Sequence, residues 1–308
     1  MEIKKAKKSQ QKLRLGISGA SGSGKTYSAL LLANSLGSKV CVIDTEQGSA
    51  SLYADKFEFD VLELTAPYSS ERYFEALKRV EMAGYDVIVI DSLSHNWNQA
   101  GGCLDSVNKM SESSRGNSYS AWGKVTPQYD KLIHSILACK AHVIATMRSK
   151  TAYELVENEK GKLAPVKRGL APIQRDGIEY EFTLMFDLDQ NHNFICTKDR
   201  TGLFSNIDIP EPLNSEIASK LLTWLNAGEV TPSHLDKHFE IEEEPSEVFL
   251  AFKKKIETET FTLHSLDIFA EKIAANSDLL SFNELEELRA VFKEVKTNLN
   301  KIEQNKEK

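Results

Sequence analysis

Several features that define other protein classes are missing from this sequence of 308 residues. No apolar run comes near the roughly 18 to 20 residues that a membrane-spanning helix needs. The lysine-rich start lacks the apolar stretch of a signal peptide. Cysteine is scarce, and its four copies stand far apart with no CxxC pair, which argues against a metal site or a disulfide framework. We therefore expect a cytoplasmic protein with free thiols and no membrane contact.

An overall excess of positive charge is missing as well. The net charge is −7, which argues against a generally basic nucleic-acid binder. The charge is unevenly spread, however. Residues 1–14 carry six basic residues against one acidic residue, whereas residues 236–308 carry 11 basic residues against 17 acidic ones. A basic segment of this kind can contact phosphate groups, although a solvated tail is the more common explanation.

Short apolar segments alternate with helical patterns from residue 13 to about residue 204, which predicts parallel βαβ units of an α/β fold. The expected strands are residues 13–18, 40–44, 61–64, 87–91 and 142–147. The expected helices are residues 25–36, 71–83 and 127–139. Residues 181–187 and 194–197 are expected as antiparallel or edge additions to the sheet. Two long loops are expected at residues 94–123 and 150–177, the second with a hairpin formed by residues 153–156 and 163–166.

The chain is expected to divide into four parts. Residues 1–12 would form a flexible basic arm and residues 13–210 the α/β core. Residues 211–245 would provide a connecting helix and an acidic linker, and residues 246–308 an α-helical appendage. An apolar stripe at helical spacing in the appendage favours a small core of its own over a partner surface.

A phosphate-binding loop is the strongest motif. The sequence GASGSGKT at residues 19–26 satisfies the P-loop (Walker A) pattern GxxxxGK[ST], follows an expected strand and opens an expected helix. Its glycines let backbone N–H groups turn toward phosphates, and the helix N-terminus favours anions. Lys25 can reach the β- and γ-phosphates. The expected ATP-binding residues are Gly19, Ala20, Ser21, Gly22, Ser23, Gly24, Lys25, Thr26 and Tyr27.

A magnesium site and a water-activating acid are expected beside this loop. The apolar strand at residues 87–90 delivers Asp91 to the carboxyl edge of the sheet, where Asp91 and the Thr26 hydroxyl can bind Mg²⁺. Another strand ends in Asp44-Thr-Glu46 at the same edge. A carboxylate there can orient or deprotonate water. Glu46 and Asp44 are both candidates for this role.

Together the segments GASGSGKT, VIDTEQGSA and DVIVIDS resemble the ATPase core of RecA-like recombinases, and most closely the small RecA-like P-loop ATPases of bacteriophages and prophages. The resemblance covers residues 12 to 205. It implies a RecA-like core with a mainly parallel sheet flanked by helices, and it assigns the catalytic base to Glu46. Thr146 would be the polar γ-phosphate sensor, a place where RecA has Gln. Lys198 and Arg200 resemble a basic pair that reaches the ATP of a neighbouring subunit.

The resemblance also implies that two stretches, residues 94–123 and 148–177, line a DNA channel. Basic residues alternate there with aromatic rings, a combination that suits single-stranded DNA. The DNA-binding candidates are Lys109, Arg115, Trp122, Arg148, Lys150, Lys167 and Arg168. Ordinary solvated loops remain an alternative.

These features lead us to expect an oligomeric, DNA-stimulated ATPase that acts on single-stranded DNA in phage recombination, repair or replication. Two other functions remain open. One is a P-loop kinase of a small molecule, although no arginine-rich lid is evident. The other is a nucleotide-gated interaction protein, in which ATP binding switches partner contacts and hydrolysis is incidental.

Overall fold

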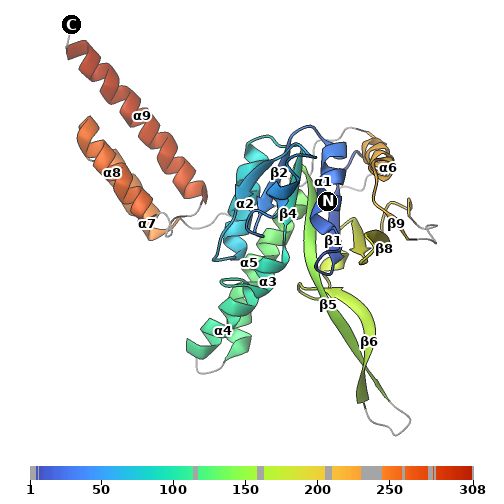
Figure 1. The fold of residues 1–308 in the computed structure, drawn as a ribbon. Helices are drawn as coiled ribbons and strands as arrows, with labels where there is room; N and C mark the ends of the chain where they lie inside the picture. Colours follow the sequence, from blue (N-terminus) through green and yellow to red (C-terminus); the bar gives the residue numbers. More distant parts are fainter. Residues whose placement is uncertain are drawn as a thin grey trace. The chain divides into compact units, whose positions relative to one another are not determined.

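The fold is described from a computed structural model. It describes residues 5, 7–113, 117–157, 163–204, 210–229, 245–258, 261–276, 280 and 282–306. The chain forms two compact units, Met1–Asp236 and Lys237–Lys308 (Figure 1). The finer division into four parts stays a prediction.

The first unit is built on a sheet that has nine strands within the described residues. Eight follow the order β3-β2-β4-β5-β1-β7-β8-β9, and β6 pairs with β5 (Figure 1). The neighbouring strands from β3 to β7 run parallel, and β8 and β9 are antiparallel additions. The parallel strands are β1 (Arg14–Gly19), β2 (Val40–Asp44), β3 (Asp60–Glu63), β4 (Val87–Asp91), β5 (His142–Glu157) and β7 (Leu184–Leu188). The other strands are β6 (Leu163–Pro172), β8 (Asn193–Asp199) and β9 (Glu211–Pro212).

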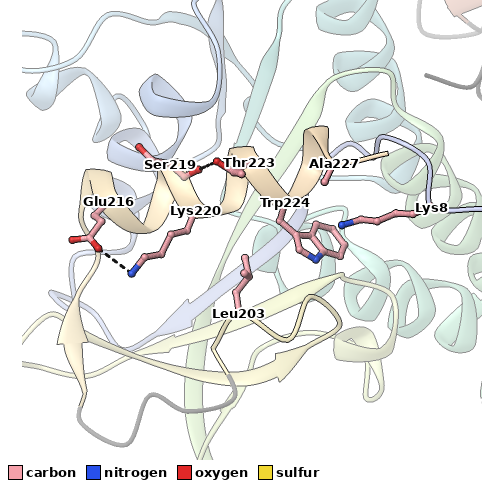
Figure 2. Close-up of a pocket in the computed structure, with 8 residues that line it drawn as sticks. All are labelled: Lys8, Leu203, Glu216, Ser219, Lys220, Thr223, Trp224 and Ala227. Carbon is pink, nitrogen blue, oxygen red and sulfur yellow. Dashed lines mark hydrogen bonds and ion pairs between the residues drawn. The ribbon is translucent and has the colours of Figure 1, made fainter. Parts of the chain in front are cut away.

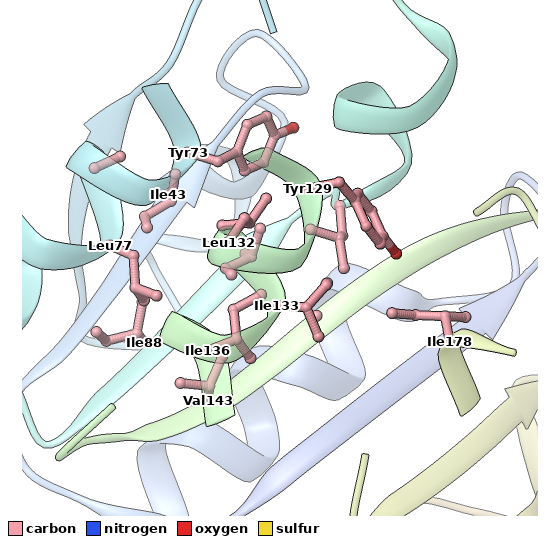
Figure 3. Close-up of a cluster of buried hydrophobic side chains, with 14 of the residues drawn as sticks. Ile43, Tyr73, Leu77, Ile88, Tyr129, Leu132, Ile133, Ile136, Val143 and Ile178 are labelled. Atoms are coloured by element: carbon pink, nitrogen blue, oxygen red, sulfur yellow. The ribbon is translucent and has the colours of Figure 1, made fainter. Parts of the chain in front are cut away.

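Helices cover both faces of this sheet, which explains why the central strands are apolar almost throughout. On one face lie α1 (Lys25–Leu36) and α6 (Ser215–Asn226). On the other lie α2 (Ser70–Met82), α4 (Cys103–Ser113) and α5 (Ser118–Ala138). Figure 3 shows the second face, where Leu77 of α2 and Ile136 of α5 pack with Ile88 of β4. The expected α/β fold with a mainly parallel sheet flanked by helices is confirmed.

The prediction of a long loop at residues 94–123 is wrong. The segment contains α3 (Ser94–Asn98), α4 and the first part of α5. Its Ser, Asn and Gly residues suggested a loop, but Cys103, Val107 and Ala121 are buried in the core. Helix α5 also begins nine residues before Pro127, where the sequence suggested its start, because Asn117 caps it by accepting the Ser120 amide at 3.1 Å.

A long hairpin replaces most of the second predicted loop. Strand β5 continues through Glu157 and pairs antiparallel with β6. The sequence placed a shorter hairpin here, at residues 153–156 and 163–166. The described chain then forms the short helix η2 (Ile178–Tyr180) before β7. The core strand that carries Thr146 is therefore continuous with the hairpin.

The basic N-terminal segment is fixed where it is described. Gln11 N donates to Leu225 O at 3.0 Å, and Gln10 N donates to Glu229 O at 3.1 Å. Lys7 forms an ion pair with Glu229 at 2.8 Å. The flexible arm predicted for residues 1–12 is thus anchored at the end of α6 over residues 7–11. Arg14, counted with the basic segment, is buried in β1.

The second unit contains α7 (Glu247–Thr258), α8 (Leu263–Ala275) and α9 (Phe282–Lys306). These helices share a small core that includes Phe249, Phe269 and Leu288. Leu288 belongs to the apolar stripe of the last predicted helix, so the stripe faces this core, as the sequence favoured. The acidic segment at residues 230–244, which includes most of the predicted linker, lies outside the described residues.

A buried histidine makes the stability of the first unit dependent on pH. His142 at the start of β5 accepts the Leu13 amide on Nδ1 at 3.0 Å. Burial lowers the pKa of His142 to about 4, and the charges of Lys12 and Arg14 act in the same direction. Below pH 6.5, the usual pKa of histidine, the unfolded chain therefore binds a proton on this side chain more readily than the folded chain does. Stability should be complete above pH 6.5, and about 3 kcal/mol should be lost as the pH falls toward 4.

Urea unfolding at a series of pH values, followed by tryptophan fluorescence, measures this loss. All three tryptophans lie in the first unit. His142→Gln keeps an acceptor for the Leu13 amide but does not titrate, so its stability should vary less between pH 6.5 and 4. Parallel curves for the two proteins would assign the pH dependence to other groups.

Candidate functional site

The loop at residues 19–26 joins β1 to α1 at the carboxyl edge of the parallel strands. Gly22 and Gly24 have φ values of +78° and +86°, a region that residues with a Cβ rarely adopt. Gly24 is the N-cap of α1 and provides no side-chain cap. The first amides of α1 therefore lack helical partners and remain available to an anion.

The side chain of Lys25 lies over this loop, and its Nζ donates to Ala20 O at 2.8 Å. Burial lowers the pKa of Lys25, the carboxylates of Asp91 and Glu46 act to raise it, and Arg148 lowers it further. All four charges are thus close enough to influence one another. Two cations and two carboxylates therefore gather beside the loop.

The other predicted loop residues differ in exposure. Ser23 is fully buried, whereas Ser21 is exposed. Tyr27, on the first turn of α1, is 38% exposed. Its ring meets those of Tyr53 and Phe57 edge-on, with centroids 5.7 and 5.2 Å away. Their assignment as ATP-binding residues stays a prediction.

Asp91 is joined to both predicted hydroxyl groups. Thr26 Oγ1 donates to Asp91 Oδ2 at 2.7 Å, and Thr146 Oγ1 donates to Oδ1. Burial raises the pKa of Asp91, although these hydrogen bonds act in the opposite direction. A hydroxyl and a carboxylate are hard oxygen ligands of the kind that Mg²⁺ prefers. The donor set of Thr26 and Asp91 therefore fits this ion.

The two candidate bases have different surroundings. Asp44 Oδ1 accepts the Glu46 amide at 2.6 Å, and Asp44 Oδ2 accepts the Gly48 amide at 2.8 Å. Both oxygens of Asp44 are thus used to fix the loop after β2. The Glu46 carboxylate is instead held by side chains, which can move. This geometry favours Glu46 as the acid that meets a substrate.

Glu46 is paired with Arg148 through two hydrogen bonds. Arg148 Nε donates to Glu46 Oε1 at 2.9 Å, and Nη2 donates to Oε2. His95 Nε2 lies 3.4 Å from Oε1. Burial acts to raise the pKa of Glu46, but Arg148 and His95 outweigh it, so the pKa falls below the usual value. Glu46 is therefore a carboxylate at neutral pH.

Arg148 and His95 are the site residues that sequence reasoning did not place here. Arg148 was expected to contact DNA because it seemed to begin a loop, and His95 was not singled out. Arg148 follows Thr146 by two residues in β5, so the two side chains share a face of the sheet. The alternation of side chains along a strand is therefore the sequence signal that could have placed Arg148 at the site. No comparable signal existed for His95, which lies in the unexpected helix α3.

Lys198 and Arg200 lie at the end of β8, away from the loop contacts described above. Lys198 Nζ donates to Glu179 O, and Arg200 Nη2 donates to Tyr180 O at 2.7 Å. Burial lowers the pKa of Lys198, and the Arg200 charge acts in the same direction. Within one chain, both cations cap carbonyl groups of η2.

The predicted DNA-binding residues do not form one described surface. Lys109 pairs with Asp105 within α4 at 2.7 Å. Trp122 is partly buried, with its ring centroid 5.8 Å from that of Trp97. Lys150 is exposed at the base of the hairpin. Lys167 and Arg168 belong to β6, and Arg115 lies outside the described residues. All of these assignments stay predictions.

A hollow of about 450 Å³ lies along α6, where the side chains of Leu203, Trp224 and Lys8 face it (Figure 2). The Lys8 ammonium lies 4.4 Å from the centre of the Trp224 ring. Glu216 and Lys220 pair across one turn of the helix at 3.0 Å. None of the predicted ATP-site residues lines this hollow.

The mainly parallel sheet and the glycine-rich loop at its carboxyl edge define the class of protein: a nucleotide-binding P-loop protein. Asp91 at the end of β4 and Glu46 shortly after β2 lie close to Thr26 and Lys25 of this loop. Comparison with known proteins identifies the family within this class.

A family model described as an AAA domain matches residues 11–206. The chain therefore belongs to the AAA-domain family of P-loop ATPases. A comparison with curated proteins gives no match. Across the described part of the chain, no helix combines the length and apolar character needed to cross a bilayer.

Proposed function

We propose that the chain hydrolyses ATP with Mg²⁺ at the loop of residues 19–26. The observation that carries this proposal is the meeting of the Thr26–Asp91 pair with Glu46 at the loop. A phosphate cradle alone would fit a switch or a kinase equally well. A carboxylate beside it supplies the group that activates water.

In this mechanism the loop amides and Lys25 hold the β- and γ-phosphates. Thr26 and Asp91 would hold Mg²⁺, which screens the phosphate charge when it is bound. Glu46 takes a proton from water as the water oxygen forms a bond to the γ-phosphorus. The bond from this phosphorus to the bridging oxygen breaks, and ADP leaves with that electron pair. Thr146, bonded to Asp91, would sense the γ-phosphate through this carboxylate.

Single-stranded DNA is the proposed polymer substrate, in phage recombination, repair or replication. The support is the resemblance to RecA-like ATPases, together with the β5–β6 hairpin in place of a plain loop. Lys150, Lys167 and Arg168 all lie on this hairpin. Because β5 also carries Thr146, a polymer on the hairpin would act on a strand that runs through the ATP site.

Oligomerisation is proposed from the same resemblance. Lys198 and Arg200 would reach the ATP of a neighbouring subunit and neutralise charge in the transition state. Their present partners are backbone carbonyl groups of η2 and not carboxylates. Exchange of these partners for phosphate oxygens breaks no ion pair in this part of the chain.

Phosphate release by the full chain with Mg²⁺ and ATP tests this proposal. Turnover should be measurable and should rise several-fold with an oligothymidylate strand, and less with a duplex of equal length. The stimulation should weaken as salt is added, because phosphate contacts release counterions. Lys150→Ala should raise the DNA concentration needed for half-maximal stimulation. Lys39→Ala, at the opposite edge of the sheet, is the matched control and should not.

The other functions predict different results. Turnover that occurs only with a phosphate-accepting small molecule would identify a kinase. Nucleotide binding without phosphate release, with or without DNA, would identify a nucleotide-gated switch. Turnover that no DNA alters would retain the ATPase and reject the DNA substrate.

A further inference from the structure

Arg148 stands at the phosphate-binding loop by the construction of the sheet. Strands β1 and β5 are neighbours, and their register pairs Arg148 with Gly19, the first residue of the loop. Arg148 also shares a face of β5 with Thr146, which bonds to Asp91. Arg148 thus belongs to the same edge as the proposed Mg²⁺ ligands.

The backbone of Arg148 is fixed, whereas its side chain has room to move. The Arg148 amide donates to Ser94 Oγ at 2.9 Å, and its carbonyl oxygen accepts the Ile173 amide at 2.6 Å. The side chain retains 41% of its exposure, against 22% for its partner Glu46. A change of partner therefore requires only side-chain rotation.

The present pair also makes Glu46 a weaker base. Arg148 donates to both carboxylate oxygens, and His95 stands beside one of them. The two hydrogen bonds from Arg148 take two of the roughly four acceptor positions of the carboxylate, and the neighbouring guanidinium charge disfavours uptake of a proton. Departure of Arg148 therefore favours hydrolysis at this site.

We propose that Arg148 exchanges Glu46 for the γ-phosphate when a nucleoside triphosphate binds. The proposal rests on the function proposed above and adds a residue that distinguishes triphosphates from diphosphates. A guanidinium group donates two parallel hydrogen bonds to carboxylate and to phosphate alike, so the same fork serves both partners. The exchange frees Glu46 to accept the proton from water. It also places the Arg148 guanidinium beside the γ-phosphate, whose negative charge is redistributed as the bond to ADP breaks.

Calorimetric titration of the full chain with Mg²⁺ and either ADP or a non-hydrolysable ATP analogue tests this exchange. Arg148→Ala should weaken binding of the analogue by roughly 10- to 100-fold, the range expected for hydrogen bonds to a charged group. Binding of ADP should not weaken, because ADP lacks the γ-phosphate. Arg148→Lys keeps the charge without the fork and should give an intermediate loss.

Removal of the competing carboxylate should have the opposite effect. Glu46→Gln should bind the analogue more tightly than the natural chain, and this gain should vanish in the double variant with Arg148→Ala. The matched control is Arg175→Ala, which removes another arginine near the base of the hairpin. Arg175 pairs with Asp130 at 2.8 Å and has no contact with the loop in the described structure. This control should bind both nucleotides normally.

Equal losses of affinity for ADP and for the analogue in Arg148→Ala, or no loss for either nucleotide, would overturn the exchange. Faster phosphate release by Arg148→Ala would also overturn it, because Arg148 would then be only an inhibitor of Glu46. If Arg148→Ala loses only the stimulation by DNA, Arg148 contacts DNA, as the sequence predicted. If Arg148→Ala does not fold, Arg148→Lys and Glu46→Gln still decide the question. If the natural chain releases no phosphate, hydrolysis fails, but the comparison of ADP with the analogue still tests the exchange.

Discussion

Replacement of Glu46 by Gln should lower the rate of phosphate release by about 10²- to 10⁴-fold, the contribution expected of a general base. The amide has the size of the carboxylate but cannot accept a proton from water. Nucleotide binding should survive, because neither the loop amides nor Lys25 is changed. Single-turnover phosphate release, measured at saturating Mg²⁺ and ATP, isolates this step from product release.

The matched control for this variant is Asp44→Asn. Asp44 accepts the amides of Glu46 and Gly48, so its replacement should disturb the loop after β2 and lower thermal stability. Its effect on turnover should be smaller than that of Glu46→Gln. If Asp44→Asn remains fully folded and loses more turnover, the base is Asp44 and the assignment to Glu46 is wrong.

Much of the fold could be predicted because its signals are local. Strand β4 is an apolar run that ends in an acid, and it appears at Val87–Asp91 as expected. The loop at residues 19–26 has a spacing that is typical of a strand–loop–helix junction. Because parallel strands end at a common edge, the meeting of Asp91 with Thr26 followed from the same pattern.

Other features depend on partners far away in the sequence. The segment at residues 94–123 has the composition of a loop, yet contacts such as that of Trp97 with Trp122 hold it as helices. Local propensity was overridden there by tertiary packing. The sequence placed Arg148 in a loop because no local sequence feature shows how far β5 extends. Its partner Glu46 lies 102 positions earlier, a pairing that one sequence cannot reveal.

Arg14 shows the same limit, since its place in a basic segment suggested contact with phosphates. The structure buries it at the start of β1, where burial lowers its pKa to about 10, against smaller effects of Cys139 and Glu81. Its guanidinium donates to the carbonyl oxygens of Leu137 and Ala141, at 3.2 and 2.8 Å, and to that of Cys139. These carbonyls lie where α5 ends and the chain turns into β5.

Replacement of Arg14 by Ala should therefore destabilise the first unit by about 3–5 kcal/mol, because several buried carbonyl groups lose a charged donor and a cavity remains. A helix leaves its last carbonyl groups without hydrogen-bond partners, and the Arg14 guanidinium supplies donors at the end of α5. Urea unfolding followed by tryptophan fluorescence reports on the first unit alone, since all three tryptophans lie in it. Arg14→Lys should recover part of the loss, because an ammonium group can satisfy fewer of the carbonyls at once.

The matched control is Lys12→Ala, two residues away in the same basic segment but exposed to solvent. Its free energy of unfolding should stay within about 0.5 kcal/mol of that of the natural chain. A similar small effect for Arg14→Ala would mean that water replaces the guanidinium at the end of α5. A much larger loss of stability for Arg14→Ala than for Lys12→Ala would show that Arg14 joins β1 to α5. Only the basic residues before Arg14 would then be available to contact phosphates.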